Sequence, residues 1–520
     1  MLNELIVEET RNANQDYHQS DRVDDDGRIT PCLVIAALAA GLGSSLQYGY
    51  NISVMTGISA FVQEFYNQSY YLKNDEYLTD NQLRWLWATT IAIYCVGGSC
   101  GSLVAVYSIY FFGSIIYTLL ENEQCMHVRF GSPRCRSFFI SNNIFLGIVI
   151  ATVPVYLSEI SPVWFRGGIT SFHQLGVSFG LLLGQVLGLY AFYSEEKWQF
   201  ALFMPLIINW VGGCVLYFCP ESPRWILLNQ SKPSRAQADE STLLLEEDIH
   251  KVASRKALVK LRGTLNVEGE IAEMLMERSL MEGSIGDRVD VIDLITLKNP
   301  VWKWPLIISI VLISNQQLGG INAIMYYTTE VFTEANLNED TVRLATVGTG
   351  VITVVMAAVT VLNVDRLGRR FFLMSSYSVM AVAALFLSIS LTSSGEAWSY
   401  MSIVFVYLFI FGFAPGPGAM TFVVIPELWT QGPRPTAMSF TGHFNWWTNF
   451  TVGLAFPFML NAMGGYSFLI FTIILVLTVL FTYCIVPETK NKTFTEIVSS
   501  FRQNRLTSSR KDFIEDNTEQ

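Results

Sequence analysis

Neutral amide side chains lie in a stretch of the chain that is otherwise apolar enough to cross a membrane. Residues 315–327 read NQQLGGINAIMYY, with three amides in a row, a fourth at Asn322 and no charged residue. An amide both donates and accepts hydrogen bonds, and burying it without a partner is costly. These side chains therefore predict either hydrogen bonds between helices or a cavity that binds a polar, uncharged ligand.

Further amides and aromatic residues occur in other apolar segments, beside residues that interrupt helices. Gln174 and Gln185 are eleven residues apart, which is three helical turns, so they share one helix face. The segment FAPGPGAMTF, residues 413–422, carries two prolines and two glycines. Within a membrane, interrupted helices are tolerated where they line a cavity or are buried in protein. The residues predicted to bind the ligand are Gln174, Gln185, Gln316, Gln317, Asn322, Tyr327, Asn445 and Trp446.

The ligand that suits this set of side chains is a sugar. A sugar needs several neutral donors and acceptors, which amides supply, and a flat surface against its C–H groups, which aromatic rings supply. The alternative is that the amides join neighbouring helices, where each hydrogen bond contributes about 1 kcal/mol. Several amides in separate segments, beside interrupted helices, favour the cavity.

Charged residues gather at the ends of the apolar segments and repeat their spacing. Glu159 and Arg166 are seven residues apart, as are Glu427 and Arg434, and Glu427 follows Glu159 by 268 residues. Carboxylates and guanidinium groups on neighbouring helices can form bidentate pairs, whereas isolated charges would only anchor the helix ends in water. The duplication favours a set of ion pairs that holds one conformation closed at these helix ends and breaks when the conformation changes. Its predicted members are Glu159, Arg166, Glu221, Arg224, Asp365, Arg369, Arg370, Glu427, Arg434 and Glu488.

The composition indicates an all-α polytopic membrane protein. Of 520 residues, 51% are hydrophobic and 15% are charged, against about a quarter charged in soluble proteins. Apolar stretches of about 20 residues, long enough to cross the hydrocarbon core, recur along the chain. The net charge of −11 argues against a nucleic-acid partner. The eight cysteines show no paired framework, and we find no cofactor, metal or enzyme motif.

The repeated spacings divide the chain into two halves joined by a polar segment, as in transporters built from structural repeats. The positive-inside rule places that segment and both tails in the cytosol, and the first span is expected to act as a signal anchor. The sequon at Asn67 lies on the opposite side and predicts N-glycosylation. The predicted parts are a cytosolic tail (1–30), an N-terminal bundle (31–220), a cytosolic helical linker (221–300), a C-terminal bundle (301–487) and a cytosolic tail (488–520).

Residues 85–158 depart from the repeat. Arg366 in VDRLGRR precedes Glu427 by 61 residues, whereas Arg129 in the similar VRFGSPR precedes Glu159 by only 30. Residues 85–120 could fold as a hairpin of two short spans, which gives twelve spans in all. Alternatively one span is lost, as in a splice variant. Twelve is favoured, because Glu159 then lies on the cytosolic side.

Carboxylates bear on whether protons drive transport. The first apolar segment, LQYGYNISVMTG, contains no Asp or Glu, and we find none in the middle of another span. A proton-coupled carrier normally needs a titratable group within the membrane. This pattern favours downhill uniport, although a carboxylate at the end of a span could still couple to protons.

Taken together, these motifs resemble the facilitative hexose transporters, the sugar-porter branch of the major facilitator superfamily. The resemblance covers about 31–61 and 150–500. It is carried by QYGYN (47–51), PVYLSEISPVWFRGG (154–168), HQLG (173–176), PESPR (220–224), QQLGGINAIMYY (316–327), DRLGRR (365–370), PELWTQGPRP (426–435), NFTVGL (449–454) and PETK (487–490).

The resemblance implies a major facilitator fold of two six-helix bundles, a cytosolic helical domain and alternating access. It implies hexose uniport in a multi-pass protein of the plasma membrane, with a proton-coupled symporter or a non-transporting sensor or defective variant as alternatives. By residue it implies sugar contacts from Gln174, Gln316, Gln317, Asn322 and Asn445, beside Trp446. Phe422 stands at the family's tryptophan position and offers an aromatic face. Phe422 and Gly319 bring the chain closer to the fructose-carrying branch, without deciding between glucose and fructose.

Overall fold

The computed structural model describes residues 29–108, 133–191, 193–194, 197–228, 240–282, 289–335, 337–430, 432–490 and 492. Helices account for nearly all of this part of the chain, and no strand occurs in it. Eight helical stretches within it are long and apolar enough to cross a membrane. The all-α prediction therefore holds for the described residues.

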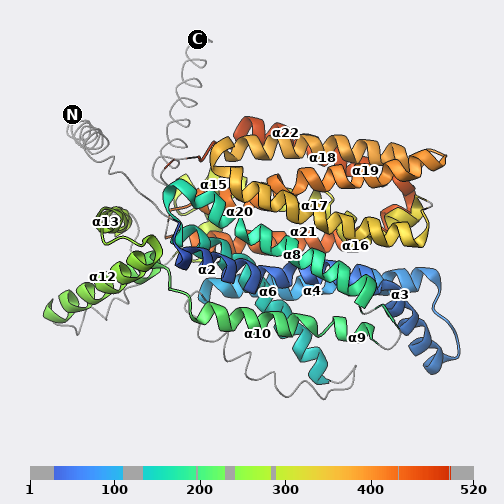
Figure 1. The fold of residues 1–520 in the computed structure, drawn as a ribbon, viewed down its shortest axis with the longest axis horizontal. Coiled ribbons are helices and arrows are strands. Elements are labelled where there is room, and N and C mark those ends of the chain that lie inside the picture. Colours follow the sequence, from blue (N-terminus) through green and yellow to red (C-terminus); the bar gives the residue numbers. More distant parts are fainter. Residues whose placement is uncertain are drawn as a thin grey trace, which may run out of the picture.

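The long helices run side by side, with the first half of the chain below the second in the view of Figure 1. The first half contains α2 (Pro31–Ala40), η1 (Gly41–Ser45), α3 (Leu46–Asn74), α4 (Asp80–Ser108), α6 (Pro133–Ile160), α7 (Arg166–Thr170), α8 (Phe172–Val186), η4 (Leu187–Ala191), α9 (Trp198–Ala201) and α10 (Met204–Tyr217). The second half contains α15 (Lys303–Leu318), α16 (Ile321–Glu334), α17 (Glu339–Leu367), α18 (Arg369–Thr392), α19 (Glu396–Phe413), η6 (Ala414–Gly418), α20 (Ala419–Glu427), α21 (Arg434–Met463) and α22 (Ser467–Ile485). The halves meet where α4 packs on α21 and α8 packs on α17.

Between the two halves, the chain forms α11 (Pro223–Leu228), α12 (Glu240–Arg262), α13 (Glu268–Glu282) and α14 (Val291–Ile295). Helices α12 and α13 stand away from one end of the bundle, which we call the linker end; the opposite end is the far end (Figure 1). Arg262 forms a 2.7 Å ion pair with Glu270 and donates to the Ile160 carbonyl at 2.8 Å. Thr30 donates to the Leu261 carbonyl at 2.7 Å. These contacts attach the linker helices to α2 and α6.

Glycines let the helices of the first half approach each other closely. A Cβ atom at Gly49 would lie 1.8 Å from the Val177 carbonyl oxygen, and one at Gly180 would lie 1.9 Å from the Leu46 carbonyl oxygen. Real Cβ atoms do not come so near, so only glycine permits this packing of α3 on α8. Small residues at helix contacts are typical of membrane proteins, because they allow two backbones to meet.

The hairpin that we expected within residues 85–120 is wrong for the part that the structure describes. Helix α4 is continuous from Asp80 to Ser108, and residues 109–132 lie outside the described ranges. The glycines of α4 serve close packing and do not interrupt the helix. A Cβ atom at Gly98 would lie 2.4 Å from the Trp446 ring, and one at Gly101 would lie 1.9 Å from the Ile144 carbonyl oxygen.

Candidate functional site

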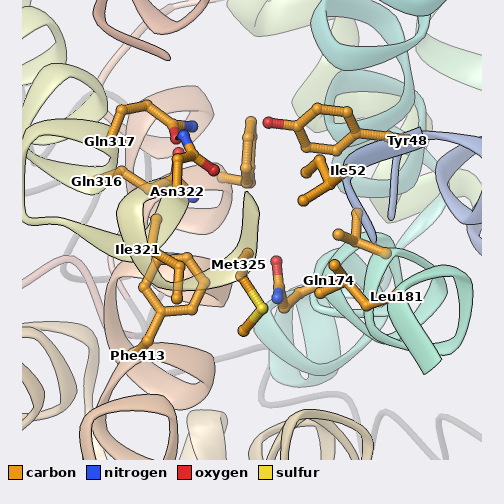
Figure 2. A pocket seen from close by; sticks show the side chains of 12 residues that line it. Tyr48, Ile52, Gln174, Leu181, Gln316, Gln317, Ile321, Asn322, Met325 and Phe413 are labelled. Carbon is orange, nitrogen blue, oxygen red and sulfur yellow. Dashed lines mark hydrogen bonds between the residues drawn. The ribbon is translucent and has the colours of Figure 1, made fainter. Parts of the chain in front are cut away.

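A small cavity lies between the two halves of the chain. The first half supplies one wall, and α15, α16, the end of α19 and α20 supply the other (Figure 2). Its volume is about 30 Å³, which is room for only about two water molecules. A sugar therefore does not fit at this position in the structure as it stands. The lining residues are Tyr48, Ile52, Gln174, Val177, Leu181, Gln316, Gln317, Ile321, Asn322, Met325, Phe413 and Phe422.

A break between α15 and α16 places the amides of the second half at the cavity. Gly320 has φ of +99°, a left-handed conformation that glycine adopts without strain. A Cβ atom there would also lie 2.7 Å from the Phe471 ring. The break therefore depends on glycine, and it brings Gln316 and Gln317 at the end of α15 next to Asn322 at the start of α16.

The amides of the second half are largely hydrogen-bonded to protein groups of the same half. Gln317 Nε2 donates to Asn445 Oδ1 at 2.6 Å, and Asn322 Nδ2 donates to Gln317 Oε1. Gln316 Nε2 donates to the Pro417 carbonyl at 2.9 Å, in the π-helical segment η6. This network holds the side chains in fixed positions around the cavity.

Among the amides that line the cavity or bond to one that does, three side-chain atoms have no hydrogen-bond partner among the described residues. They are Gln174 Nε2, Gln316 Oε1 and Asn445 Nδ2, and all are buried. Buried polar atoms are nearly always paired, so each exception needs an explanation. Gln174 and Gln316 line the cavity from opposite halves, one with a free donor and the other with a free acceptor. Hydroxyl groups of a ligand could satisfy both.

Other predicted ligand-binding residues lie beside the cavity or beyond it. Gln185 donates to Thr349 Oγ1 at 2.9 Å and joins α8 to α17. It lies about 16 Å along the helix from Gln174, since each residue adds about 1.5 Å. The remaining three are Tyr327, which donates to the Gly453 carbonyl at 2.7 Å, Trp446, which donates to Ser102 Oγ at 3.0 Å, and Asn445, which accepts from Gln317.

The cavity also contains residues that we did not predict. Tyr48 lies in the motif QYGYN, so a signal was present, and its ring meets the Trp446 ring at 5.5 Å. Met325 and Phe413 also lie in motifs noted in the sequence, QQLGGINAIMYY and FAPGPGAMTF, but their apolar side chains did not distinguish them from other residues of apolar helices. Phe422 does line the cavity, with its ring edge-on to His173 at 4.5 Å.

At the linker end, one arginine lies between two carboxylates of the second half. Arg369 is 2.9 Å from Asp365 and 3.1 Å from Glu427, and all three side chains are at least 88% buried. Glu427 also accepts from Thr489 at 2.6 Å. Glu488 accepts the backbone N–H groups at the start of α18. Asp365, Arg369, Glu427 and Glu488 thus meet in one cluster.

Asp365 extends this cluster to the first half of the chain. Its carboxylate accepts the backbone N–H groups of Gly167 at 3.2 Å and Gly168 at 2.8 Å, at the beginning of α7. The first N–H groups of a helix lack partners within the helix, and the helix dipole favours an anion there. Asp365 therefore joins α17 to α7 across the two halves at the linker end.

The other predicted members of the charged set lie near this cluster, and Arg166 interacts electrostatically with Arg224, Glu427 and Arg434. Glu159 accepts from Ser222 Oγ at 2.5 Å, and Arg434 donates to the Trp429 carbonyl at 3.2 and 3.0 Å. Arg370 donates to the Tyr483 carbonyl. The remaining three lie at the linker end, with Arg166 and Arg224 buried and Glu221 exposed.

One carboxylate that bears on proton coupling, Glu330, lies within an apolar helical stretch, although not in its middle. Glu330 belongs to the apolar helical stretch Pro300–Glu334 and is only partly exposed. It stands near the far end of that stretch, where the sequence changes from apolar to polar.

Asn67, the predicted glycosylation site, lies in α3, four turns beyond the residues that line the cavity. Its glycosylation stays a prediction. Asn67→Gln should remove a mobility shift of several kilodaltons that N-glycosidase also removes from the chain made in animal cells. Asn491→Gln, in a sequon expected on the cytosolic side, is the control and should leave mobility unchanged. A shift that survives Asn67→Gln would contradict the prediction.

Known proteins with similar sequences are sugar transporters. Residues 36–501 match the family "Sugar (and other) transporter". The chain is 35% identical over 489 residues to "Solute carrier family 2, facilitated glucose transporter member 5" of Bos taurus, covering 92% of this chain and 93% of that protein. It is 33% identical over 507 residues to member 1 of Gallus gallus, covering 94% and 97%.

Solved structures show the same fold at lower sequence identity. The proton:xylose symporter XylE bound to 6-bromo-6-deoxy-D-glucose matches with a TM-score of 0.72 and 20% identity, over 91% of this chain and 100% of that one. The inward open conformation of XylE from E. coli matches with a TM-score of 0.62 and 22% identity, over 90% and 99%. The predicted major facilitator fold is thereby confirmed. The chain belongs to the sugar transporter family of multi-pass membrane proteins.

Proposed function

We propose that this chain carries a hexose, glucose or fructose or both, down its concentration gradient by alternating access. The observation that carries the proposal is the pair Gln174 and Gln316, which face one buried cavity from opposite halves with unsatisfied polar atoms. The names of the relatives, facilitated glucose transporters, support the same substrate class. Tyr48 and Phe422 add aromatic faces for the C–H surface of the sugar.

The amide network explains how a sugar could bind without a large desolvation cost. Gln317, Asn322 and Asn445 bond to one another when the cavity is small. Sugar hydroxyls can replace these bonds one for one, because a hydroxyl is both donor and acceptor. The two unsatisfied atoms of Gln174 and Gln316 would gain partners, so the protein makes more hydrogen bonds with sugar bound than without it.

The cluster around Asp365 gives the transport cycle its inner gate. Opening the linker end requires the Asp365 carboxylate to leave the N–H groups of Gly167 and Gly168. Water can then solvate both groups, so the cost of opening is moderate. We place the linker end, with α12, α13 and both tails, in the cytosol of a cell whose plasma membrane holds the protein. The five-part division given above is part of this proposal.

Uptake of radiolabelled D-glucose and D-fructose by proteoliposomes tests the proposal. We expect saturable uptake of at least one sugar at equal pH on both sides, ending when the concentrations are equal. Binding of sugar without flux would instead support a non-transporting sensor or a defective variant. Absence of both binding and flux for every hexose would contradict the proposal.

Proton-coupled symport is the second candidate, because Glu330 lies within a span. In that case uptake would need an inward proton gradient, and Glu330→Gln would abolish the dependence on the gradient. We expect uptake to be independent of the gradient, since Glu330 does not line the cavity that would bind the sugar. Accumulation of sugar above the external concentration would favour symport.

A further inference from the structure

The wall of the cavity toward the far end is formed by α16, and this helix is bent. Tyr327 has φ of −120° and ψ of 23°, outside the helical range. A bend of this kind arises where a side chain competes for backbone carbonyls of the helix. Two hydroxyl groups of the first half reach α16 just before the bend, and they have no part in the cavity lining described above.

The first hydroxyl belongs to Thr56 on α3. Its Oγ1 atom is 2.9 Å from the Met325 carbonyl oxygen and 3.1 Å from the Tyr326 carbonyl oxygen. The Thr56 side chain is 3% exposed, so water does not compete for these carbonyls in this structure. Thr56 follows the cavity residue Ile52 by one helical turn, on the side of the far end.

The second hydroxyl belongs to Tyr94 on α4. It is hydrogen-bonded to the Tyr326 hydroxyl, which donates its single proton to Asn449 Oδ1 at 2.7 Å. Tyr94 must therefore be the donor to Tyr326. The two tyrosine rings meet edge to face, with centroids 6.5 Å apart. This chain of hydrogen bonds joins α4 of the first half to α16 and α21 of the second.

We propose that the hydroxyl groups of Thr56 and Tyr94 form an outer clasp, which holds the bent helix α16 over the cavity and sets how often the cavity opens toward the far end. The proposal rests on the proposed function in one respect, that the two halves move apart around the cavity. Thr56 and Tyr94 are positioning residues: they act through α16 and do not contact the sugar.

The clasp has a direct energetic consequence. In the closed state, loss of the Thr56 hydroxyl removes the donor that reaches two buried carbonyl groups, whereas in the open state water takes its place. Loss of the Tyr94 hydroxyl removes the donor to Tyr326 in the same way. A net hydrogen bond of about 1 kcal/mol corresponds to a change of about fivefold in the ratio of closed to open molecules. Each variant should therefore shift the equilibrium toward the open state by about that factor.

The test measures the opening itself, without sugar. Fluorophores placed at Asp80 at the beginning of α4 and at Thr333 near the end of α16 report their separation by single-molecule energy transfer, in purified protein in nanodiscs. Both positions are exposed. Thr56→Val and Tyr94→Phe keep the shape of the side chain and remove only the hydroxyl group. Each should increase the ratio of open to closed molecules about fivefold, and the double variant more than either.

Tyr66→Phe is the matched control. The Tyr66 hydroxyl is 2.9 Å from Thr90 Oγ1, and this hydrogen bond joins α3 to α4 within the first half. Its loss should leave the ratio of open to closed molecules unchanged. The proposal is overturned if Thr56→Val and Tyr94→Phe also leave the distribution unchanged, or if Tyr66→Phe shifts it equally.

Transport measurements separate this proposal from the proposed function. If the chain carries no hexose but the variants still shift the distance distribution, the clasp stands and the substrate assignment fails. If hexose uptake is normal and the distribution does not respond, the clasp fails and the transport function stands.

Discussion

Arg369→Leu will raise the ratio of molecules that are open at the linker end to molecules that are closed there more than a hundredfold. Arg369 lies between Asp365 and Glu427 at 2.9 and 3.1 Å, and its removal leaves two buried carboxylates without their cation. Breaking a buried ion pair by removing one partner costs roughly 3–5 kcal/mol. That cost falls on the closed state, because water can solvate both carboxylates once the linker end opens.

Thiol reactivity measures this shift. A cysteine introduced at Val177, which lines the cavity, should react at least tenfold faster with an impermeant reagent applied from the linker side when Arg369 is leucine. Asp365→Asn should act in the same direction with a smaller effect. It weakens the contact with α7, but Arg369 and Glu427 still form an ion pair. The control is Arg255→Leu, which breaks the exposed pair with Glu268 and should change nothing, since exposed pairs contribute little. Equal reactivity in the parent protein and in all three variants would contradict the proposed gate.

Gln316→Ala will raise the dissociation constant for hexose about tenfold or more. The substitution removes an unsatisfied acceptor that lines the cavity and a donor that is fixed by the Pro417 carbonyl. One or two lost hydrogen bonds at roughly 1 kcal/mol each account for this factor. Equilibrium binding to the purified protein is the measurement.

Asn315→Ala is the matched control for that experiment. Asn315 is the neighbouring amide on the same helix, but it is only partly buried and is not part of the cavity lining. Its substitution should change the dissociation constant less than twofold. An unchanged constant in Gln316→Ala would assign that amide to contacts between helices.

The sequence correctly indicated that an amide lies at the cavity when residues that break a helix stand next to it. Gln316, Gln317 and Asn322 flank Gly319 and Gly320, and an amide beside a break in a membrane helix must face protein or a cavity. Periodicity was less informative, because it identifies a helix face and not a depth. Gln185 shares a face with Gln174 but lies three turns further along, between α8 and α17.

Contacts between distant segments could not be predicted from spacing. The spacing of Glu159 and Arg166 pointed to the linker end, but not to the two N–H groups after Arg166 that receive Asp365. The glycines of α4 could equally have marked a turn or a close approach of helices, and the second proved correct at Gly98 and Gly101. A turn and a close helix contact can be distinguished only when the position of the neighbouring helix is known.

The central claim is that amides from both halves bind one sugar molecule between them. A structure of the protein determined with bound hexose tests it most directly. The account predicts sugar density between Gln174 and Gln316, with hydroxyl groups within 3.2 Å or so of Gln174 Nε2 and Gln316 Oε1. Sugar bound elsewhere, with Gln317 still bonded to Asn445 and both free amide atoms still without a partner, would contradict it.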